Sequence, residues 1–239
     1  MTATTAALPE TPCAACGATD YAYRAVLWPE LVKAWELGPD DEACINRQQG
    51  LHCRACGNNL RMISLAAGLL RALGAAGPLE AFCRGKPALR LLEINTAGFL
   101  TRFLRELPGH RLVEYPDFDM MALGLDDGAF DVVVHSDSLE HVPDPVRGLA
   151  ECLRVLRPGG LCVFTVPILA GRLTRSREGL PPSHHGAAST ATDDQLVRTE
   201  FGADFWKYVL EAGFDSCETY AYEYPAALVA VARKAGNAP

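Results

Sequence analysis

Apolar runs alternate with segments of helical spacing through the second half of the chain, and this alternation limits the fold more than any other feature of the sequence. A short continuous apolar run predicts a strand that is buried on both faces, and apolar residues three and four positions apart predict a helix. Strands and helices that take turns along a chain favour an α/β fold, in which helices cover both faces of a mostly parallel sheet. The expected strands are 88–94, 111–115, 131–135, 161–166, 216–222 and 227–233, and the expected helices are 30–37, 60–73, 98–107, 145–156 and 204–212.

A segment rich in glycine, alanine and proline, residues 74–87, separates this pattern from the region before it. We therefore expect two parts: a small cysteine-bearing, partly helical module over residues 1–75 and an α/β domain over residues 88–239. A chain of 239 residues is long enough for one such domain with a small module in front of it.

Two C-x-x-C-G sequences stand in the N-terminal module, and their cysteines are Cys13, Cys16, Cys53 and Cys56. The two-residue spacing allows both thiolates of a pair to face one tetrahedral metal ion, about 2.3 Å from each sulfur. The four cysteines therefore predict a structural Zn²⁺ site. Redox-active or simply buried cysteines are the alternative interpretation, because the two pairs are further apart than in most zinc ribbons.

The start of the chain, residues 1–12, has no basic segment followed by an apolar one, so we expect no signal peptide. The most apolar helical window, residues 62–73, is shorter than the roughly 20 residues that cross a bilayer, so no membrane span is expected. Nine cysteines without a secretory signal are typical of a reducing compartment, and we expect a cytoplasmic protein. The net charge of −7 argues against nucleic acid as a partner, because that binding depends on cations at the phosphates.

One block of sequence carries a family resemblance. It runs Phe130-Asp-Val-Val-Val-His135-Ser-Asp-Ser-Leu-Glu140-His141-Val-Pro-Asp144-Pro and continues with Glu151-Cys-Leu-Arg154-Val-Leu-Arg157-Pro-Gly-Gly160. The block resembles the class I S-adenosylmethionine-dependent methyltransferases, in the type 11 branch that carries LEH-V-x-D-P followed by E-x-x-R-V-L-x-P-G-G. The resemblance covers residues 88 to 233, and it implies a Rossmann-like fold with S-adenosyl-L-methionine as the cofactor.

The cofactor residues are expected beyond the carboxyl ends of the central strands, where open parallel sheets bind ligands. The turn after the first strand has small residues where the family has a glycine-rich loop, and these still allow the backbone to approach a ligand. The resemblance implies an acid for the ribose hydroxyls, with Glu114 and Asp117 as competing candidates, and an adenine contact at Asp119. Surface carboxylates are the alternative. The expected cofactor-binding residues are Glu93, Asn95, Thr96, Ala97, Gly98, Glu114, Asp117, Asp119, Met120, His135 and Ser136.

The chain is short between the second and third expected strands, since 14 residues lie between Tyr115 and Phe130. The family has a helix and a strand there, and with two loops these need about 20 residues. We therefore predict a sheet that is trimmed at this edge, with only a turn around residues 116–119. The strand at 111–115 then forms the edge and needs a cover, either the cysteine module or a partner chain.

Two histidines follow the strand that is expected to deliver groups to the reacting methyl. An imidazole has a pKa near 6.5, so His141 and His135 are the candidate catalytic bases for a hydroxyl or amine acceptor. The alternatives are a structural role in capping the next helix, and no dedicated base at all, because methyl transfer from a sulfonium depends mainly on alignment.

A long irregular segment, residues 171–186, follows the fourth strand at the mouth of the expected cleft. Its cations in an otherwise acidic chain predict recognition of an anionic acceptor, and solvated loop charge is the alternative. The expected substrate residues are Arg172, Arg175, Arg177, His184 and His185.

These features together predict a methyltransferase that acts on a small or carrier-linked, anionic acceptor. An rRNA or tRNA methyltransferase whose zinc module grips RNA is one alternative. A catalytically degenerate domain that serves as a binding module is another, because the loop at residues 95–98 departs from the family pattern. The sequence does not predict an oligomeric state.

Overall fold

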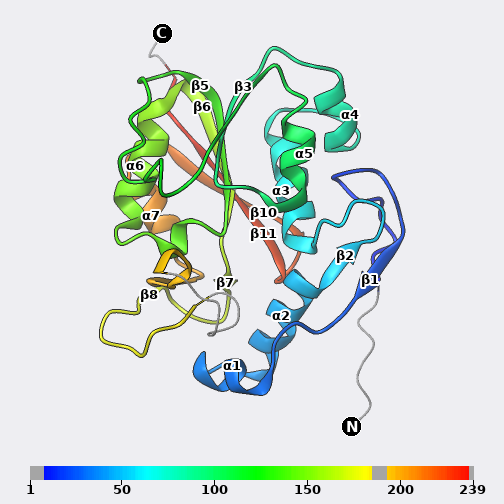
Figure 1. Cartoon of the computed structure of the whole chain (residues 1–239), viewed down its shortest axis with the longest axis vertical. Helices are drawn as coiled ribbons and strands as arrows, with labels where there is room; N and C mark the ends of the chain where they lie inside the picture. Colours follow the sequence, from blue (N-terminus) through cyan, green and yellow to red (C-terminus); the bar gives the residue numbers. More distant parts are fainter. Residues whose placement is uncertain (1–7, 185–192, 237–239) are drawn as a thin grey trace.

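The computed structural model describes residues 8–184 and 193–236, and a six-stranded sheet forms its centre (Figure 1). In spatial order the strands are β10 (Ser216–Glu223), β11 (Ala227–Arg233), β6 (Leu156–Thr165), β5 (Phe130–Ser136), β3 (Arg90–Ile94) and β4 (Gly109–Val113). The last four run parallel to one another, whereas β11 is antiparallel to β6 and β10 is antiparallel to β11. This mostly parallel sheet confirms the predicted Rossmann-like α/β class.

Helices cover both faces of the sheet (Figure 1). One face carries α3 (Leu60–Ala72), α4 (Leu79–Arg84), the 3-10 helix η1 (Gly98–Leu100) and α5 (Thr101–Leu104), and the other carries α6 (Pro145–Val155) and α7 (Trp206–Glu211). Successive side chains of a strand point to opposite faces. Val132 and Val134 of β5 accordingly pack on the α3 side, and Val133 packs on the α6 side.

Local signals explain where the elements begin and end. Asp144 caps α6, because its side chain accepts a hydrogen bond of 3.1 Å from the amide of Arg147, and Pro145 stands at the first helical position. The helix expected at 98–107 is shorter than predicted, with a 3-10 turn before α5. After Leu104 the amides of Glu106 and Leu107 donate to carbonyls three residues back, and Pro108 disfavours any further helix.

The sheet is trimmed at the predicted edge. The described chain from Glu114 to Ala129 forms no helix or strand and contains only turns and an isolated bridge between Asp119 and Ala122. β4 is therefore the edge strand, two residues earlier in the sequence than expected. The cysteine module, a predicted cover for this edge, contacts other elements: the carbonyl of Ala14 accepts from the amide of Leu79 at the start of α4.

From residue 8 to the start of α3, the N-terminal module contains two short strands and two helices: β1 (Tyr21–Tyr23), α1 (Pro29–Ala34), α2 (Pro39–Gly50) and β2 (Leu51–Cys53). β1 pairs antiparallel with β2, and Tyr21 lies opposite Cys53. α3 packs closely on β11, since a Cβ atom built on Gly68 would lie 2.6 Å from Val229 Cγ1. The module and the sheet therefore share one apolar core through α3.

A second, three-stranded sheet follows the carboxyl end of β6. It contains β7 (Ile168–Leu169), β9 (Thr199–Gly202) and β8 (Arg175–Ser176), together with the 3-10 helix η3 (Asp193–Gln195), and another 3-10 helix, η2 (Leu139–His141), follows β5. Arg172 joins this sheet to α2 through an ion pair of 2.9 Å with Asp41. None of the helices in residues 8–184 and 193–236 is long and apolar enough to cross a membrane.

Candidate active site

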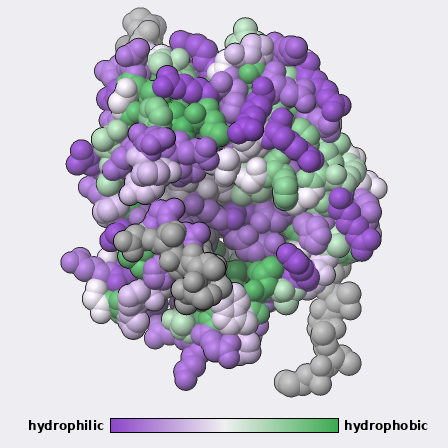
Figure 2. Space-filling model, viewed as in Figure 1, coloured by the Kyte–Doolittle hydropathy of each residue, from purple (hydrophilic) through white to green (hydrophobic). Residues whose placement is uncertain are grey.

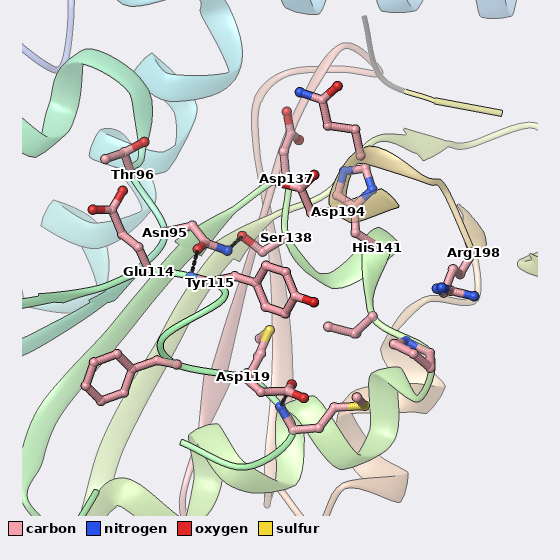
Figure 3. Close-up of a pocket in the computed structure, with 16 residues that line it drawn as sticks. Asn95, Thr96, Glu114, Tyr115, Asp119, Asp137, Ser138, His141, Asp194 and Arg198 are labelled. Atoms are coloured by element: carbon pink, nitrogen blue, oxygen red, sulfur yellow. Dashed lines mark hydrogen bonds between the residues drawn. The ribbon is translucent and has the colours of Figure 1, made fainter. Parts of the chain in front are cut away.

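A cleft of about 720 Å³ opens beyond the carboxyl ends of β3, β4 and β5 (Figure 3). Within the sheet, β4 is the neighbour of β3 on one side and β5 is its neighbour on the other, so the strand order reverses at β3. The cleft lies at this point. Hydrophilic side chains cover the middle of this face of the molecule (Figure 2). The predicted residues that line the cleft are Asn95, Thr96, Glu114, Asp119, Met120 and His141.

Asn95 ties the three strand ends together (Figure 3). Its backbone amide donates to the carbonyl of Val113 at 2.8 Å. Its side-chain Oδ1 accepts from the backbone amide of Tyr115 at 3.0 Å, and its Nδ2 donates to Ser138 Oγ at 3.1 Å. The backbone of Asn95 is left-handed, with a φ of 54°, and asparagine tolerates this conformation better than most residues. A turn without the family's glycine pattern is thus held open by side-chain hydrogen bonds.

Glu93 fixes the same turn from beneath. The side chain is fully buried and accepts hydrogen bonds from the amide of Ala97 at 2.8 Å and from Thr101 Oγ1 at 2.6 Å, and it lies 2.7 Å from His110 Nε2. Glu93 and Ala97 therefore shape the loop from the core and do not line the cleft.

The acidic candidates separate in space. Glu114 and Asp119 both line the cleft, whereas Asp117 is exposed and does not. Asp119 Oδ1 accepts from the amide of Met121 at 2.8 Å, which fixes the carboxylate, and Met120 forms an apolar wall beside it. Of the two competing ribose candidates, Glu114 lines the cleft and Asp117 does not.

A second hollow, of about 570 Å³, adjoins the cleft and shares Thr96 and Asp137 with it. Its walls come from the turn after β3, from the end of β5 and from the cysteine module. Predicted cofactor residues in it are Gly98 and Ser136, and the module contributes Arg24, Gln49, His52, Asn59 and Arg61.

The two predicted bases have different surroundings. His135 is fully buried, its ring stacks on Phe164 with a centroid distance of 4.8 Å, and burial lowers its pKa to about 3. It lines neither hollow, so this geometry does not support a role as base or cofactor ligand.

His141 lies in the wall of the cleft, and burial lowers its pKa as well. Its Nδ1 lies 3.1 Å from the carbonyl of Leu196. This hydrogen bond requires a proton on Nδ1, so the neutral ring has its lone pair on Nε2, which lies 3.7 Å from Glu140 Oε1. Burial, followed by the nearby Asp137, raises the pKa of Glu140 well above its usual range.

The arginines expected to bind an anionic acceptor are paired with carboxylates of the chain itself. Arg172 pairs with Asp41 at 2.9 Å, Arg175 pairs with Glu200 at 2.6 Å, and Arg177 also pairs with Glu200. None of the three lines the cleft or the second hollow. His184 forms an isolated bridge with Leu196 and lines neither hollow, and His185 lies outside the described residues.

Other cations reach the site, and the sequence prediction missed them. Arg198 lines the cleft and Arg24 lines the second hollow; both are exposed, and neither has an ion pair with a described residue. Arg61 is buried and pairs with Asp137. A charged residue in the apolar sequence of α3 was the one signal that could have indicated Arg61.

The four predicted cysteines meet in one cluster, with all ligand atoms within 4.8 Å of one another. Cys13 Sγ lies 3.8 Å from Cys56 Sγ, and Cys16 Sγ lies 3.7 Å from Cys53 Sγ. A tetrahedral zinc ion with Zn–S bonds of about 2.3 Å needs sulfurs about 3.8 Å apart, so the cluster fits the ion.

The local structure explains this arrangement. Gly57 has a φ of 77° and donates its amide to the carbonyl of Cys53 at 2.8 Å, and Gly17 does the same toward Cys13 at 2.7 Å. The hydrogen bond from Cys13 lowers the pKa of Cys56 to about 4, which favours a thiolate there. Two matching glycine turns therefore aim both pairs at one point.

Comparison with known proteins agrees with this geometry. Residues 78–164 match the family model of the methyltransferase domain. The chain contains an S-adenosylmethionine-dependent methyltransferase domain. This domain thus includes the turn held by Asn95 and Glu93, the acidic segment and the end of β5.

Two curated relatives are methyltransferases by name. The chain is 36% identical over 110 residues to the demethylmenaquinone methyltransferase of Clavibacter sepedonicus, which covers 45% of this chain and 42% of that protein. It is 46% identical over 59 residues to the sarcosine/dimethylglycine N-methyltransferase of Halorhodospira halochloris, covering 25% and 21%. The chain therefore spans less than half the length of these relatives.

Among solved structures, the CurJ carbon methyltransferase aligns over 87% of this chain and 62% of its own, with 14% identity and a TM-score of 0.48.

Proposed function

We propose that the protein transfers a methyl group from S-adenosylmethionine to a small or carrier-linked, anionic acceptor, and that Zn²⁺ holds its four N-terminal cysteines. The observation that carries this proposal is the cleft at the reversal of strand order, with Glu114 and Asp119 in its wall. A carboxylate accepts from both ribose hydroxyls, and another accepts from the adenine amine. Glu114 and Asp119 supply these two acceptors within one short segment.

The chemistry of the step requires little beyond alignment. When bound, the cofactor supplies an electrophilic methyl group on a sulfonium, and the protein must hold the acceptor atom in line with it and keep water away. His141 can take a proton from an acceptor hydroxyl or amine through Nε2, because its Nδ1 is committed to the carbonyl of Leu196.

Two exposed arginines support an anionic acceptor. Arg198 at the cleft and Arg24 at the second hollow have no ion-pair partner among the described residues, so both are available to a carboxylate or phosphate. The second hollow, on the module side, supports a role of the zinc module in completing the acceptor site.

The direct test is calorimetric titration with S-adenosylhomocysteine. The wild type should bind it, and Glu114→Gln and Asp119→Asn should each weaken binding by about 10-fold, since each removes a charge-assisted acceptor. Asp117→Asn is the matched control, because this exposed carboxylate of the same segment lies outside the cleft and its loss should change nothing. A wild-type protein that does not bind the ligand would overturn the proposal in favour of a degenerate domain.

A further inference from the structure

One ion pair stands where the cleft and the second hollow meet. Arg61, in the first turn of α3, pairs through Nη2 with Oδ2 of Asp137, the residue that follows β5. Arg61 is 7% exposed, and Asp137 has a left-handed backbone with a φ of 48°. A non-glycine residue in this conformation costs energy, so the surrounding structure holds Asp137 in place.

Both side chains keep further polar atoms that nothing in the described chain satisfies. Nε and Nη1 of Arg61 and Oδ1 of Asp137 are buried and have no hydrogen-bond partner among the described residues. Buried polar groups are nearly always hydrogen-bonded, and an unsatisfied charged group is costly. A ligand that brings one anionic and one cationic group would satisfy both residues at once.

The position of the pair indicates which ligand this is. Asp137 and Thr96 line both hollows, and Arg61 lines the second. A ligand whose adenosine lies against Glu114 and Asp119 passes Thr96 and brings its other end to Asp137. In S-adenosylmethionine this end is an α-amino acid, with one carboxylate and one ammonium group.

We propose that Arg61 and Asp137 bind the zwitterionic amino-acid end of the cofactor. Arg61 donates hydrogen bonds to the α-carboxylate, and Asp137 accepts from the α-ammonium group. The inference rests on the proposed function, and it assigns a cofactor contact to a helix of the N-terminal module, outside residues 78–164 of the family match.

The cysteine cluster positions Arg61. Arg61 follows Cys56 by five residues, and Asn59 caps α3 between them by accepting from the amide of Met62 at 3.0 Å. The carbonyl of Cys56 in turn accepts from Arg102 Nη2 at 3.1 Å. The second cysteine pair is thus fixed to α5, and α3 starts from this fixed point.

The test compares two ligands by calorimetry. S-adenosylhomocysteine has the amino-acid end, whereas 5′-methylthioadenosine has the same adenosine and a thioether without it. Arg61→Gln should weaken the binding of S-adenosylhomocysteine by about 10- to 100-fold, the range for hydrogen bonds to charged groups. It should leave the binding of methylthioadenosine nearly unchanged. Glu114→Gln should weaken both ligands, because it acts at the shared ribose.

Two further variants keep the test decisive. Arg61→Gln/Asp137→Asn avoids an unpaired buried carboxylate and should show the same selective loss. Arg71→Gln, on the same helix but 60% exposed, is the control and should bind both ligands as the wild type does. Equal loss of both ligands, or no loss of either, would overturn the assignment to Arg61 and Asp137. A wild type that binds neither ligand would instead overturn the proposed function.

Discussion

At the scale of single residues, burial lowers the pKa of both candidate histidines, and their positions distinguish them. His135 and His141 lie six positions apart, yet only His141 reaches the cleft. His135 belongs to β5 and its ring stacks on Phe164 of β6, where a charged imidazole loses its hydration without gaining a partner.

This burial predicts a pH dependence of stability. The pKa of His135 is about 3 in the folded protein and about 6.5 when unfolded, so between these values the unfolded chain binds more protons. The free energy of unfolding should therefore fall as pH drops below about 6.5, by up to about 1.4 kcal/mol per pH unit from this residue. His135→Leu should remove that part, which urea unfolding at pH 7.5 and pH 5 would measure.

The free energy of unfolding of the wild type must then fall relative to that of His135→Leu on acidification. A difference between the two that is constant with pH would contradict this account. A metal ion that the wild type binds in addition to the zinc of the four-cysteine cluster, and that this variant loses, would contradict it too. His135, Cys152 and Cys162 place three ligand atoms within 4.8 Å of one another, so such a loss would identify an ion in the core.

At the scale of elements, the sequence predicted the sheet well because buried parallel strands are continuous apolar runs. The trimmed edge was also predictable, since it followed from chain length alone. α2 was missed although Pro39 and three acidic residues open it, because its apolar residues are too few for a helical pattern.

The site was only partly predictable. Asn95, Glu114 and Asp119 follow strands, so the order of elements places them at one edge of the sheet. Arg61, Arg24 and Arg198 come from other regions, and their positions depend on packing that no local pattern records. The arginines of residues 172–177 have carboxylate partners far away in sequence, such as Asp41, which no spacing could have indicated.

Two arginines next to strands of the three-stranded sheet, Arg198 and Arg177, should have different roles. Arg198→Gln should raise the acceptor KM several-fold with little change in stability, because its side chain is exposed in the cleft. Arg177→Met should lower the free energy of unfolding by about 2 kcal/mol, because the partly buried Glu200 loses one of its two arginine partners. Steady-state kinetics and urea unfolding separate the two effects. A raised acceptor KM without loss of stability in Arg177→Met would instead favour Arg177 as an acceptor residue.

At the scale of the whole molecule, the cysteine cluster and the cofactor cleft are parts of one structure. A Cβ atom built on Gly57, the glycine of the second C-x-x-C-G sequence, would lie 3.1 Å from the ring of Phe99 in the turn after β3. The second C-x-x-C-G sequence and the turn after β3 are in direct contact, so a change in one should move the other.

Removal of the metal should therefore weaken cofactor binding. The purified protein should contain about one Zn²⁺ per chain, and Cys16→Ser should lose the metal, lower the melting temperature and weaken S-adenosylhomocysteine binding. Cys217→Ser is the control, since this half-buried cysteine lies on β10, away from the cluster. Less than half an equivalent of zinc, with unchanged melting of Cys16→Ser, would rule out a structural metal.

The contact of α3 with β11 has a consequence for anyone who recombines such proteins. The family match begins at residue 78, yet Gly68 already lies against Val229 near the other end of the chain, with no space for a side chain between them. A chimera joined at residue 78 would combine a helix from one parent with a strand shaped for another. Exchange of the cysteine module between methyltransferases should succeed only when β10 and β11 are transplanted with it, so that these distant segments are inherited together.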